Sequence, residues 1–336
     1  MRIERAWLLL TSLTLAACAG AGAETRPAAS ADDRLAQQAE HNAPEASSLV
    51  KQAEQKLAAN DAQGATALLD DALQTDPKDA RAALDLGIAR EMLGNPQGAE
   101  QAYRHAIEIK PEFAEPLNNL GVLLRDRGDL KEAIELLKRA AAANPDSAAA
   151  RTNLALALED QGDVAGARAA YEKALQLAPK EAMTRANYGL LLLQSGERDA
   201  AVRELQRALA DGQGNRAALL AVGNGLRRAG DGQGAVQAMQ AAVSAGGEPA
   251  TPALLSELAL AERAAGQKDA AYATLERVLK QDDRYAIAHY LLANMLAADQ
   301  RFADAKKHYE HYLKLEPQGA QAASARERLG VIGNAK

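Results

Sequence analysis

A repeat with a period of about 34 residues constrains the fold of this chain more than any other feature of its sequence. The segment 114–145 contains two amphipathic patterns of period 3.6, about Leu117–Arg127 and Leu130–Ala143, which are separated by Gly128 and closed by Pro145. The same pattern returns when the frame is shifted by one period in either direction. A fixed period of this length is typical of proteins built from stacked repeats.

The period is visible in residues that rarely recur at a fixed spacing by chance. Of the eleven prolines, four are spaced by one period each and a fifth closes the last unit in the same phase. These prolines are Pro77, Pro111, Pro145, Pro179 and Pro317. Six glycines recur at the expected turn between the two helices of a unit: Gly94, Gly128, Gly162, Gly196, Gly230 and Gly266. The second helix has alanine in one phase throughout, at Ala65, Ala99, Ala133, Ala167, Ala201, Ala235, Ala271 and Ala305.

These columns resemble the pattern of the tetratricopeptide repeat (TPR) family, whose repeating unit is a helix–turn–helix of the same length. The small residue of that family's first helix falls at Ala53, Gly87, Gly121, Ala155, Gly189, Gly223, Ala259 and Ala293. The bulky residue of its second helix falls at Leu69, Tyr103, Leu137, Tyr171, Leu205, Met239, Leu275 and Tyr309. The resemblance covers residues 46–319 and implies eight units, which start near Ala46, Ala80, Ala114, Ala148, Ala182, Arg216, Pro252 and Ala286.

The fold that we expect is therefore all-α. It is an α-solenoid of about eight TPR helix pairs in a right-handed superhelix, followed over residues 320–336 by a capping helix (about Gln321–Val331) and tail. Small side chains let two helices of a pair approach closely, and a proline ends each second helix because it lacks an N–H. Between units six and seven the period slips by two residues, through 244–249, where glycine and proline predict a kink.

Residues 1–17 are predicted to be a signal peptide. Two arginines precede the mostly apolar stretch 6–17, which is shorter than the roughly 20 residues that span a bilayer. The motif Leu15–Cys18 resembles a bacterial lipobox, in which the cysteine becomes lipid-modified. The alternative is an ordinary secretory signal that is cut after Ala23. We favour the lipoprotein interpretation because Cys18 is the only cysteine of the chain.

Residues 18–45 would then comprise the lipidated cysteine and a flexible linker, which could reach roughly 30 Å from the membrane. A lipid on Cys18 would anchor the protein to a membrane. Because Ala19 rather than an aspartate follows the cysteine, the resemblance favours the periplasmic face of the outer membrane of a Gram-negative bacterium.

The composition excludes several kinds of chemistry. The formal net charge is −6 and no basic stripe is present, which argues against nucleic acid as a partner. With Cys18 used for the anchor, the mature chain has no thiol for disulfides, zinc sites or nucleophilic catalysis. His308 and His311 lie three residues apart on one helix, but no third ligand accompanies them. We therefore expect no metal, no cofactor and no enzymatic activity.

One column suggests a binding surface. Asn119, Asn153 and Asn187 are spaced by one period each on the first helix of their units. In TPR arrays this helix lines the concave groove, and the column resembles the asparagine ladder of O-GlcNAc transferases. An amide can donate to and accept from the backbone of an extended peptide. The alternative is that asparagine is only a tolerated polar residue here.

Neighbouring positions extend this predicted surface. Asp85 shares the phase of the three asparagines, and the other residues expected on the surface are Asn118, Thr152, Arg125, Asp126 and Glu159. Farther along the chain, Leu220, Tyr290 and Leu291 are expected to make the groove apolar, suited to an amphipathic helix or a hydrophobic tail.

Three functions are compatible with the sequence. The first is a lipid-anchored, non-enzymatic scaffold that binds peptide segments of partner proteins; resemblance to bacterial TPR lipoproteins favours assembly of a pilus or secretin. The second is a soluble periplasmic chaperone, or an adaptor for peptidoglycan enzymes. The third is the TPR arm of a sugar transferase, which is weakened because no stretch outside 46–319 is long enough for a catalytic domain.

Overall fold

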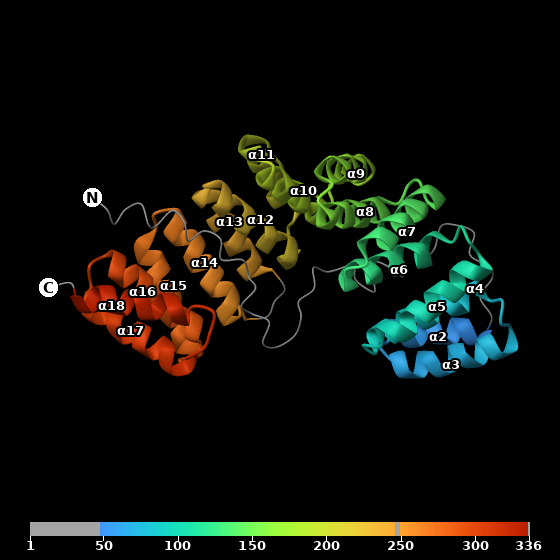
Figure 1. The fold of residues 1–336 in the computed structure, drawn as a ribbon, viewed down its shortest axis with the longest axis horizontal. Helices are drawn as coiled ribbons and strands as arrows, with labels where there is room; N and C mark the ends of the chain where they lie inside the picture. The colour runs from blue at the N-terminus through green and yellow to red at the C-terminus, as the bar shows by residue number, and fades with distance from the viewer. Residues whose placement is uncertain (1–47, 246–248, 335–336) are drawn as a thin grey trace. The chain divides into compact units, whose positions relative to one another are not determined.

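The computed structural model describes residues 48–245 and 249–334. The predicted signal peptide, Cys18 and the linker lie outside the described residues. In the described part the chain forms 17 α-helices and no β-strand. The helices follow one another as eight consecutive pairs and one additional helix (Figure 1), which confirms the predicted α-solenoid with a C-terminal cap.

The helix boundaries agree closely with the repeat frame. The first helices of the pairs are α2 (Ser48–Ala58), α4 (Ala80–Met92), α6 (Ala114–Arg127), α8 (Ala148–Gln161), α10 (Ala182–Gln194), α12 (Arg216–Ala229), α14 (Pro252–Ala264) and α16 (Ala286–Ala298). The second helices are α3 (Ala62–Thr75), α5 (Pro96–Ile109), α7 (Leu130–Ala143), α9 (Val164–Leu177), α11 (Arg198–Asp211), α13 (Gly232–Ser244), α15 (Lys268–Gln281) and α17 (Phe302–Leu315). The cap is α18 (Ala322–Asn334). Every predicted unit start from Ala80 onward is the first residue of a helix; the start near Ala46 lies outside the described residues.

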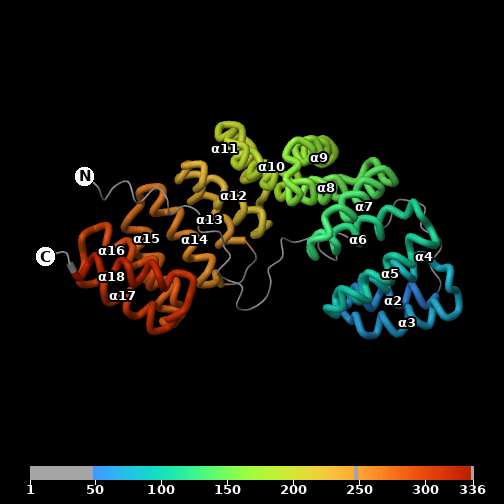
Figure 2. Tube along the Cα trace, viewed as in Figure 1, coloured from blue at the N-terminus to red at the C-terminus, as the bar shows by residue number. Residues whose placement is uncertain are grey.

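The chain forms two compact units, which divide between Pro179 and Lys180. The N-terminal unit contains α2–α9 and the C-terminal unit contains α10–α18 (Figure 2). The kink predicted at 244–249 involves residues 246–248, which lie outside the described residues. On either side of them, α13 and α14 contribute Ala242 and Leu255 to one hydrophobic core. The division between compact units therefore falls elsewhere than at the slip in the repeat period.

Glycine is required at the turn inside each central pair. The six predicted turn glycines all have positive φ angles, for example 94° at Gly128. This left-handed conformation strains residues that have a Cβ. In the first and last pairs the corresponding residues are Asn60 and Gln300, with φ of 59° and 60°. The turn geometry is therefore retained at both ends of the array even where the glycine is not.

An Asp/Asn-x-x-Gly sequence starts several of the second helices. The side chain of Asp163 accepts a hydrogen bond from the Gly166 backbone N–H at 2.9 Å, and Asn95 does the same for Gly98 at 3.0 Å. These N-caps satisfy backbone donors that have no partner inside the helix. At Gly166 a Cβ would lie 2.4 Å from a carboxylate oxygen of Asp163, so glycine makes room for the cap.

The small and bulky columns predicted from the sequence meet in the four pairs whose small residue is glycine. A Cβ added at Gly87 would lie 2.3 Å from the ring of Tyr103, which is completely buried. At Gly223 the nearest atom would be the terminal methyl of Met239, at 2.7 Å. Glycine in α4 and α12 therefore allows the facing side chain of the second helix to pack directly on the backbone.

Polar contacts also join one pair to the next. In the N-terminal unit, the ring Nε2–H of His105 donates to the Pro77 carbonyl at 3.0 Å, and Arg139 donates to the Pro111 carbonyl at 2.8 Å. Each bond spans 28 residues and therefore links a second helix to the end of the preceding one. The loop carbonyls two residues after α3 and α5 are therefore hydrogen-bonded by the following repeat.

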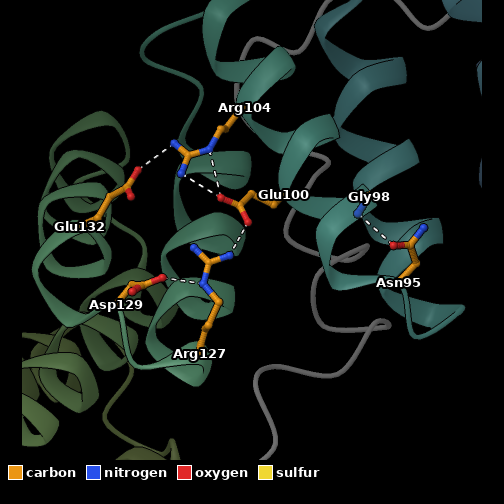
Figure 3. Close-up of polar contacts among 7 residues, drawn as sticks. All are labelled: Asn95, Gly98, Glu100, Arg104, Arg127, Asp129 and Glu132. Atoms are coloured by element: carbon orange, nitrogen blue, oxygen red, sulfur yellow. Dashed lines mark hydrogen bonds and ion pairs between the residues drawn. The ribbon is translucent and has the colours of Figure 1, made fainter.

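A charged network joins the second and third pairs (Figure 3). Arg104 of α5 contacts Glu100 at 2.9 Å and Glu132 of α7 at 2.7 Å, while Arg127 of α6 contacts both Glu100 and Asp129. The hydrogen bond from Arg127 is the main cause that lowers the pKa of Glu100, and the hydrogen bond from Arg104 lowers it further. Desolvation of the carboxylate opposes both effects only in part. Arginines and carboxylates alternate in this network, so it holds three helices together at the surface.

Candidate peptide-binding surface

In the N-terminal unit, asparagines connect the first helices of two neighbouring repeats. The Nδ2 of Asn153 in α8 donates to the Oδ1 of Asn118 in α6 at 2.9 Å. Asn118 in turn donates to the Oδ1 of Asn119 at 3.4 Å, a long bond. Asn119 and Asn153 are only 5% and 7% exposed. Two of the predicted ladder residues therefore form a largely buried amide network, with Asn118 between them.

Arg125 lies between carboxylates on α6 and α8. Its guanidinium contacts Asp126 at 2.7 Å and Asp160 at 3.6 Å, and its side chain is 8% exposed. Glu159, another predicted surface residue, accepts a hydrogen bond from the Tyr171 hydroxyl at 3.0 Å. Both side chains therefore make contacts that stabilise the repeats.

Asp85 is completely buried in α4. One carboxylate oxygen pairs with Arg81 at 3.0 Å, and Arg81 also contacts Glu54 of α2 at 2.6 Å. Burial raises the pKa of Asp85 to about 7, and the attraction of Arg81 only partly offsets this effect. In this conformation no surface of Asp85 is available to a peptide, and its position is explained by the ion pair with Arg81.

Asn187 lies in α10 of the C-terminal unit and is 5% exposed. Two residues away, Arg185 contacts Glu204 of α11 at 2.6 Å and lies 3.8 Å from Asp211. Asn187 belongs to a different compact unit from Asn119 and Asn153, so only the latter two are placed side by side.

The apolar groove predicted at the C-terminal end is not exposed. Tyr290 is 2% exposed and Leu291 7%, because both belong to hydrophobic cores. The cap α18 packs against the last pair and its Ser324 forms a hydrogen bond of 3.0 Å with the Tyr290 hydroxyl. Leu220 is partly buried against the neighbouring core. The prediction of an apolar groove at Tyr290 and Leu291 was therefore wrong: the chain's own last helix covers Tyr290.

The structure instead shows a group of arginines that sequence reasoning missed. In α12, Arg227 donates to Asn224 at 3.3 Å and lies 3.9 Å from Glu257 of α14. Arg263 of α14 is exposed and interacts electrostatically with Arg227 and with Arg328 of α18. The sequence could have indicated two of these arginines, because Arg227 and Arg263 stand at the same position in their repeats as Arg125 does in its own.

Three histidines cluster where α16 packs on α17. His289 Nε2–H donates to the Asp283 carbonyl at 3.0 Å, so in the neutral ring its Nδ1 is the acceptor for His308 Nδ1–H, at 2.9 Å. The ring of His311 lies 4.2 Å from that of His289. Desolvation lowers the pKa of His289 and of His308. In the described part of the chain, no set of three or more such side chains is arranged to hold a metal ion.

A cavity of about 420 Å³ lies between α15, α16 and α17. Leucines and Tyr272 form its apolar lining, while Lys280, Arg301 and Lys307 are the cationic residues that line it. Asp304 pairs with Arg301 at 3.1 Å and with Lys307 at 3.2 Å, which neutralises part of this charge.

The described helices include none with the length and apolar character that crossing a membrane requires.

Comparison with known sequences agrees with this repeat architecture. Two tetratricopeptide repeat family models match the chain, one over residues 118–182 and 256–320 and the other over residues 56–120 and 158–222. Together the matches cover more than half of the sequence. The chain belongs to the tetratricopeptide repeat family. Among proteins with curated descriptions, none matches this sequence significantly.

Several solved structures have a similar fold. PilF of Pseudomonas aeruginosa is 23% identical with a TM-score of 0.51, over 58% of this chain and 89% of PilF. PilW, a widely conserved type IV pilus biogenesis factor, is 23% identical with a TM-score of 0.52, over 58% of this chain and 91% of PilW. A tetratricopeptide repeat protein of Parabacteroides merdae is 19% identical with a TM-score of 0.51, over 76% of this chain and 99% of that protein. At these identities the similarity establishes the fold alone.

Proposed function

We propose that this chain is a non-enzymatic scaffold that binds peptide segments of partner proteins along the first helices of its repeats. TPR proteins are generally protein-binding scaffolds. The observation that carries the proposal is the amide network of Asn118, Asn119 and Asn153, which bridges two repeats. Within the described residues, Asn119 Nδ2 and Asn153 Oδ1 have no hydrogen-bond partner, so one donor and one acceptor remain for a peptide backbone.

The amide surface is tested by changing Asn119, Asn153 and Asn187 together to alanine. We expect loss of partner proteins crosslinked to the chain in envelope membranes. A matched control changes three exposed amides of the second helices, Gln101, Gln237 and Gln240, to alanine and should retain the partners. Circular dichroism spectra and thermal melts are needed for both variants, because removing a buried hydrogen bond costs about 1 kcal/mol. Unchanged capture by a folded triple variant would contradict the role of the asparagines.

The cellular location is part of the same proposal. Cys18 carries the lipid, and the scaffold faces the periplasm from the outer membrane. The lipobox-like motif that ends at Cys18 supports this location. Cells fed a labelled fatty acid should label the protein and should not label the Cys18→Ser variant. If neither form is labelled and both are periplasmic, the protein is the soluble chaperone of the alternative hypothesis.

Assembly of a pilus or secretin is the proposed pathway. Its support is the fold shared with PilF and PilW, together with the resemblance of the sequence to bacterial TPR lipoproteins. Deleting the gene should reduce the amount of secretin multimer in outer membranes, and expression from a plasmid should restore it. Normal multimers in the deletion strain, with peptidoglycan enzymes among the crosslinked partners, would favour the adaptor alternative.

A further inference from the structure

The cavity between the last two pairs of helices has no part in the proposed scaffold function. Its volume is about 420 Å³, and its lining comes from α15, α16 and α17. Leu292 and Leu296 of α16 form its apolar part together with Leu279 and Tyr272 of α15. Cavities of about 300–1,000 Å³ that are mostly apolar and have a few polar groups are typical of small-molecule sites. The cavity is therefore of a size and character that suit a small ligand.

The contact between repeats is made differently at this cavity. In the N-terminal unit, Arg139 of the second helix α7 donates to the Pro111 carbonyl in the loop after α5, at 2.8 Å. Asp283, in the loop after α15, stands at the same position in its repeat as Pro111. Its carbonyl accepts its hydrogen bond from His289 of the first helix α16, at 3.0 Å. This link to the preceding repeat therefore comes from α16 instead of α17, and the cavity lies between α15 and α17.

An arginine stands beside the cavity where earlier repeats have no cation. In the seven earlier pairs the residue that precedes the second helix is acidic or an amide, for example Asp163 and Glu197. In the last pair this residue is Arg301, which forms no side-chain hydrogen bond to the start of α17. The dipole of a helix disfavours a positive charge at its N-terminus. Arg301 is thus poorly suited to start α17, and its place in the cavity lining favours a role toward an anion.

The charges that line the cavity do not balance. Asp304 is shared by Arg301, at 3.1 Å, and Lys307, at 3.2 Å. Lys280 is exposed and has no ion pair within residues 48–245 and 249–334. Desolvation lowers the pKa of His308, so this ring adds no positive charge at pH 7. Three cations thus face two carboxylates, an excess of one positive charge; the five residues are Lys280, Arg301, Lys307, Glu276 and Asp304.

We propose that this cavity binds a small amphiphile that has an aliphatic chain and one carboxylate. The chain lies against the leucines and is thereby removed from water. The carboxylate lies at Lys280 and Arg301 and balances the excess charge; a guanidinium can hold a carboxylate through two parallel hydrogen bonds. This inference goes beyond the proposed scaffold function and does not depend on it, because the cavity lies apart from the asparagine network.

Isothermal titration calorimetry of the purified mature chain tests the ligand class. The chain carries Cys18→Ser, so that no attached lipid competes. Decanoate, used below the concentration at which it forms micelles, should bind at one site. Decyltrimethylammonium has the same chain and the opposite charge and should bind at least about tenfold more weakly. Butyrate has the same carboxylate but too short a chain and should not bind detectably.

Two pairs of variants place the ligand in the cavity. Lys280→Gln with Arg301→Gln should weaken decanoate binding about fivefold. The control, Arg277→Gln with Lys306→Gln, removes the same charge from exposed positions on the same two helices outside the cavity lining and should change binding less than about twofold.

The second pair tests the apolar part. Leu279→Phe should fill part of the cavity and weaken decanoate binding at least about tenfold. Leu209→Phe makes the same change at the same position two repeats earlier and should leave binding within about twofold. Circular dichroism spectra establish that each variant is folded. If Leu279→Phe does not fold, the charge variants decide, because they change exposed residues only.

Four outcomes would overturn the inference. They are no binding of decanoate to the chain with Cys18→Ser alone, equal binding of decanoate and decyltrimethylammonium, equal losses in the two double variants, or unchanged binding in a folded Leu279→Phe variant. The scaffold function is tested separately by the partners crosslinked in envelope membranes, so either proposal can fail while the other stands.

Discussion

The first helices of the two units differ in how their charges are balanced. In the N-terminal unit, one arginine is shared by carboxylates: Arg81 contacts Glu54 and Asp85, and Arg125 contacts Asp126 and Asp160. In the C-terminal unit, Arg185 likewise contacts Glu204 and lies 3.8 Å from Asp211, whereas Arg227 lies 3.9 Å from Glu257. Arg81 of the N-terminal unit thus forms close ion pairs, whereas the contact between Arg227 and Glu257 in the C-terminal unit is long.

This difference predicts that the two ion pairs contribute unequally to the stability of the fold. Arg81 is buried and its side chain is 9% exposed, while Asp85 is not exposed at all. Arg227 and Glu257 are 18% and 19% exposed and separated by 3.9 Å. Removing Arg81 should therefore destabilise the fold more than removing Arg227.

The largest expected effect is that of Arg81→Met. It leaves the carboxylate of Asp85 buried without its partner, which should cost about 3–5 kcal/mol at pH 8. Arg227→Met should cost about 1 kcal/mol or less, because the contact that it breaks is long and partly exposed. Urea unfolding followed by circular dichroism measures both, with midpoints compared directly since repeat arrays need not unfold in two states. Similar midpoint shifts for the two variants would remove the proposed difference between the units.

A second contrast concerns the glycines that face a bulky side chain. Gly87→Ala should destabilise the N-terminal unit by about 1–3 kcal/mol, because the new methyl group meets the rigid ring of Tyr103. Gly223→Ala in the C-terminal unit should cost less, because the terminal methyl of Met239 can move. Thermal melts of the two variants measure the difference. If the two variants lost the same stability, the flexibility of the facing side chain would not determine how strongly a glycine-to-alanine change destabilises the pair.

Stability around Asp85 in α4 and around the histidines of α16 and α17 should respond to pH in opposite directions. The folded pKa of Asp85 is raised from 3.8 to about 7, so the N-terminal unit loses stability as pH rises through that window. The pKa values of His289 and His308 are lowered from 6.5, so the last pair, α16–α17, loses stability as pH falls below 6.5, while the raised pKa of Glu257 elsewhere in the C-terminal unit has the opposite effect. The charged groups that face this histidine pair are His311, Asp283, Asp304 and Lys307.

Acidification from pH 7 to pH 5 should therefore stabilise the pair α4–α5 in the N-terminal unit and destabilise the last pair, α16–α17, in the C-terminal unit. Hydrogen exchange of peptides from each unit, corrected for the intrinsic exchange rate at each pH, measures the two responses. In the Asp85→Asn variant, stability around α4 should depend less on pH, and in the His308→Gln variant the same should hold for α16 and α17. A parallel response in both units of the unmodified chain would contradict the assignment.

The smallest expected effect lies at the turn of the last pair. Gln300 has a φ of 60°, where the other C-terminal turns have glycine. Gln300→Gly should therefore stabilise the C-terminal unit by about 0.5–1 kcal/mol. Gln281→Gly, in the last turn of α15, is the control and should destabilise it by about 1 kcal/mol. A loss of stability in Gln300→Gly would show that the side chain of Gln300 contributes more than the backbone strain costs.

Much of the fold could be predicted because local chemistry sets the helix ends. The predicted unit starts at Ala80 and Ala114 are the first residues of helices, since proline and turn glycine fix the frame on both sides. The division at Pro179 could not be predicted, because Pro179 has the same phase as Pro145. What separates the units is the packing of helices, which no single residue encodes.

The site was harder to predict than the fold. The asparagine column was visible in the sequence, but the burial of Asn119 and its link to Asn153 through Asn118 depend on how two repeats stack. Tyr290 was expected in a groove because the position of α18 could not be inferred from periodicity. The proximity of Arg263 to Arg328 was missed because Arg328 lies in the cap, outside the repeat frame, where the position within a repeat carries no information.

Site-specific photocrosslinking in living cells tests the central claim, that first helices contact partner proteins, most directly. A photoreactive residue placed at Asp126 or Arg228, both exposed on first helices, should give adducts with other proteins. The same residue at Lys138 or Gln237, both exposed on second helices, should give few or none. Adducts of equal yield from both sets of positions, or from the second helices alone, would contradict the account.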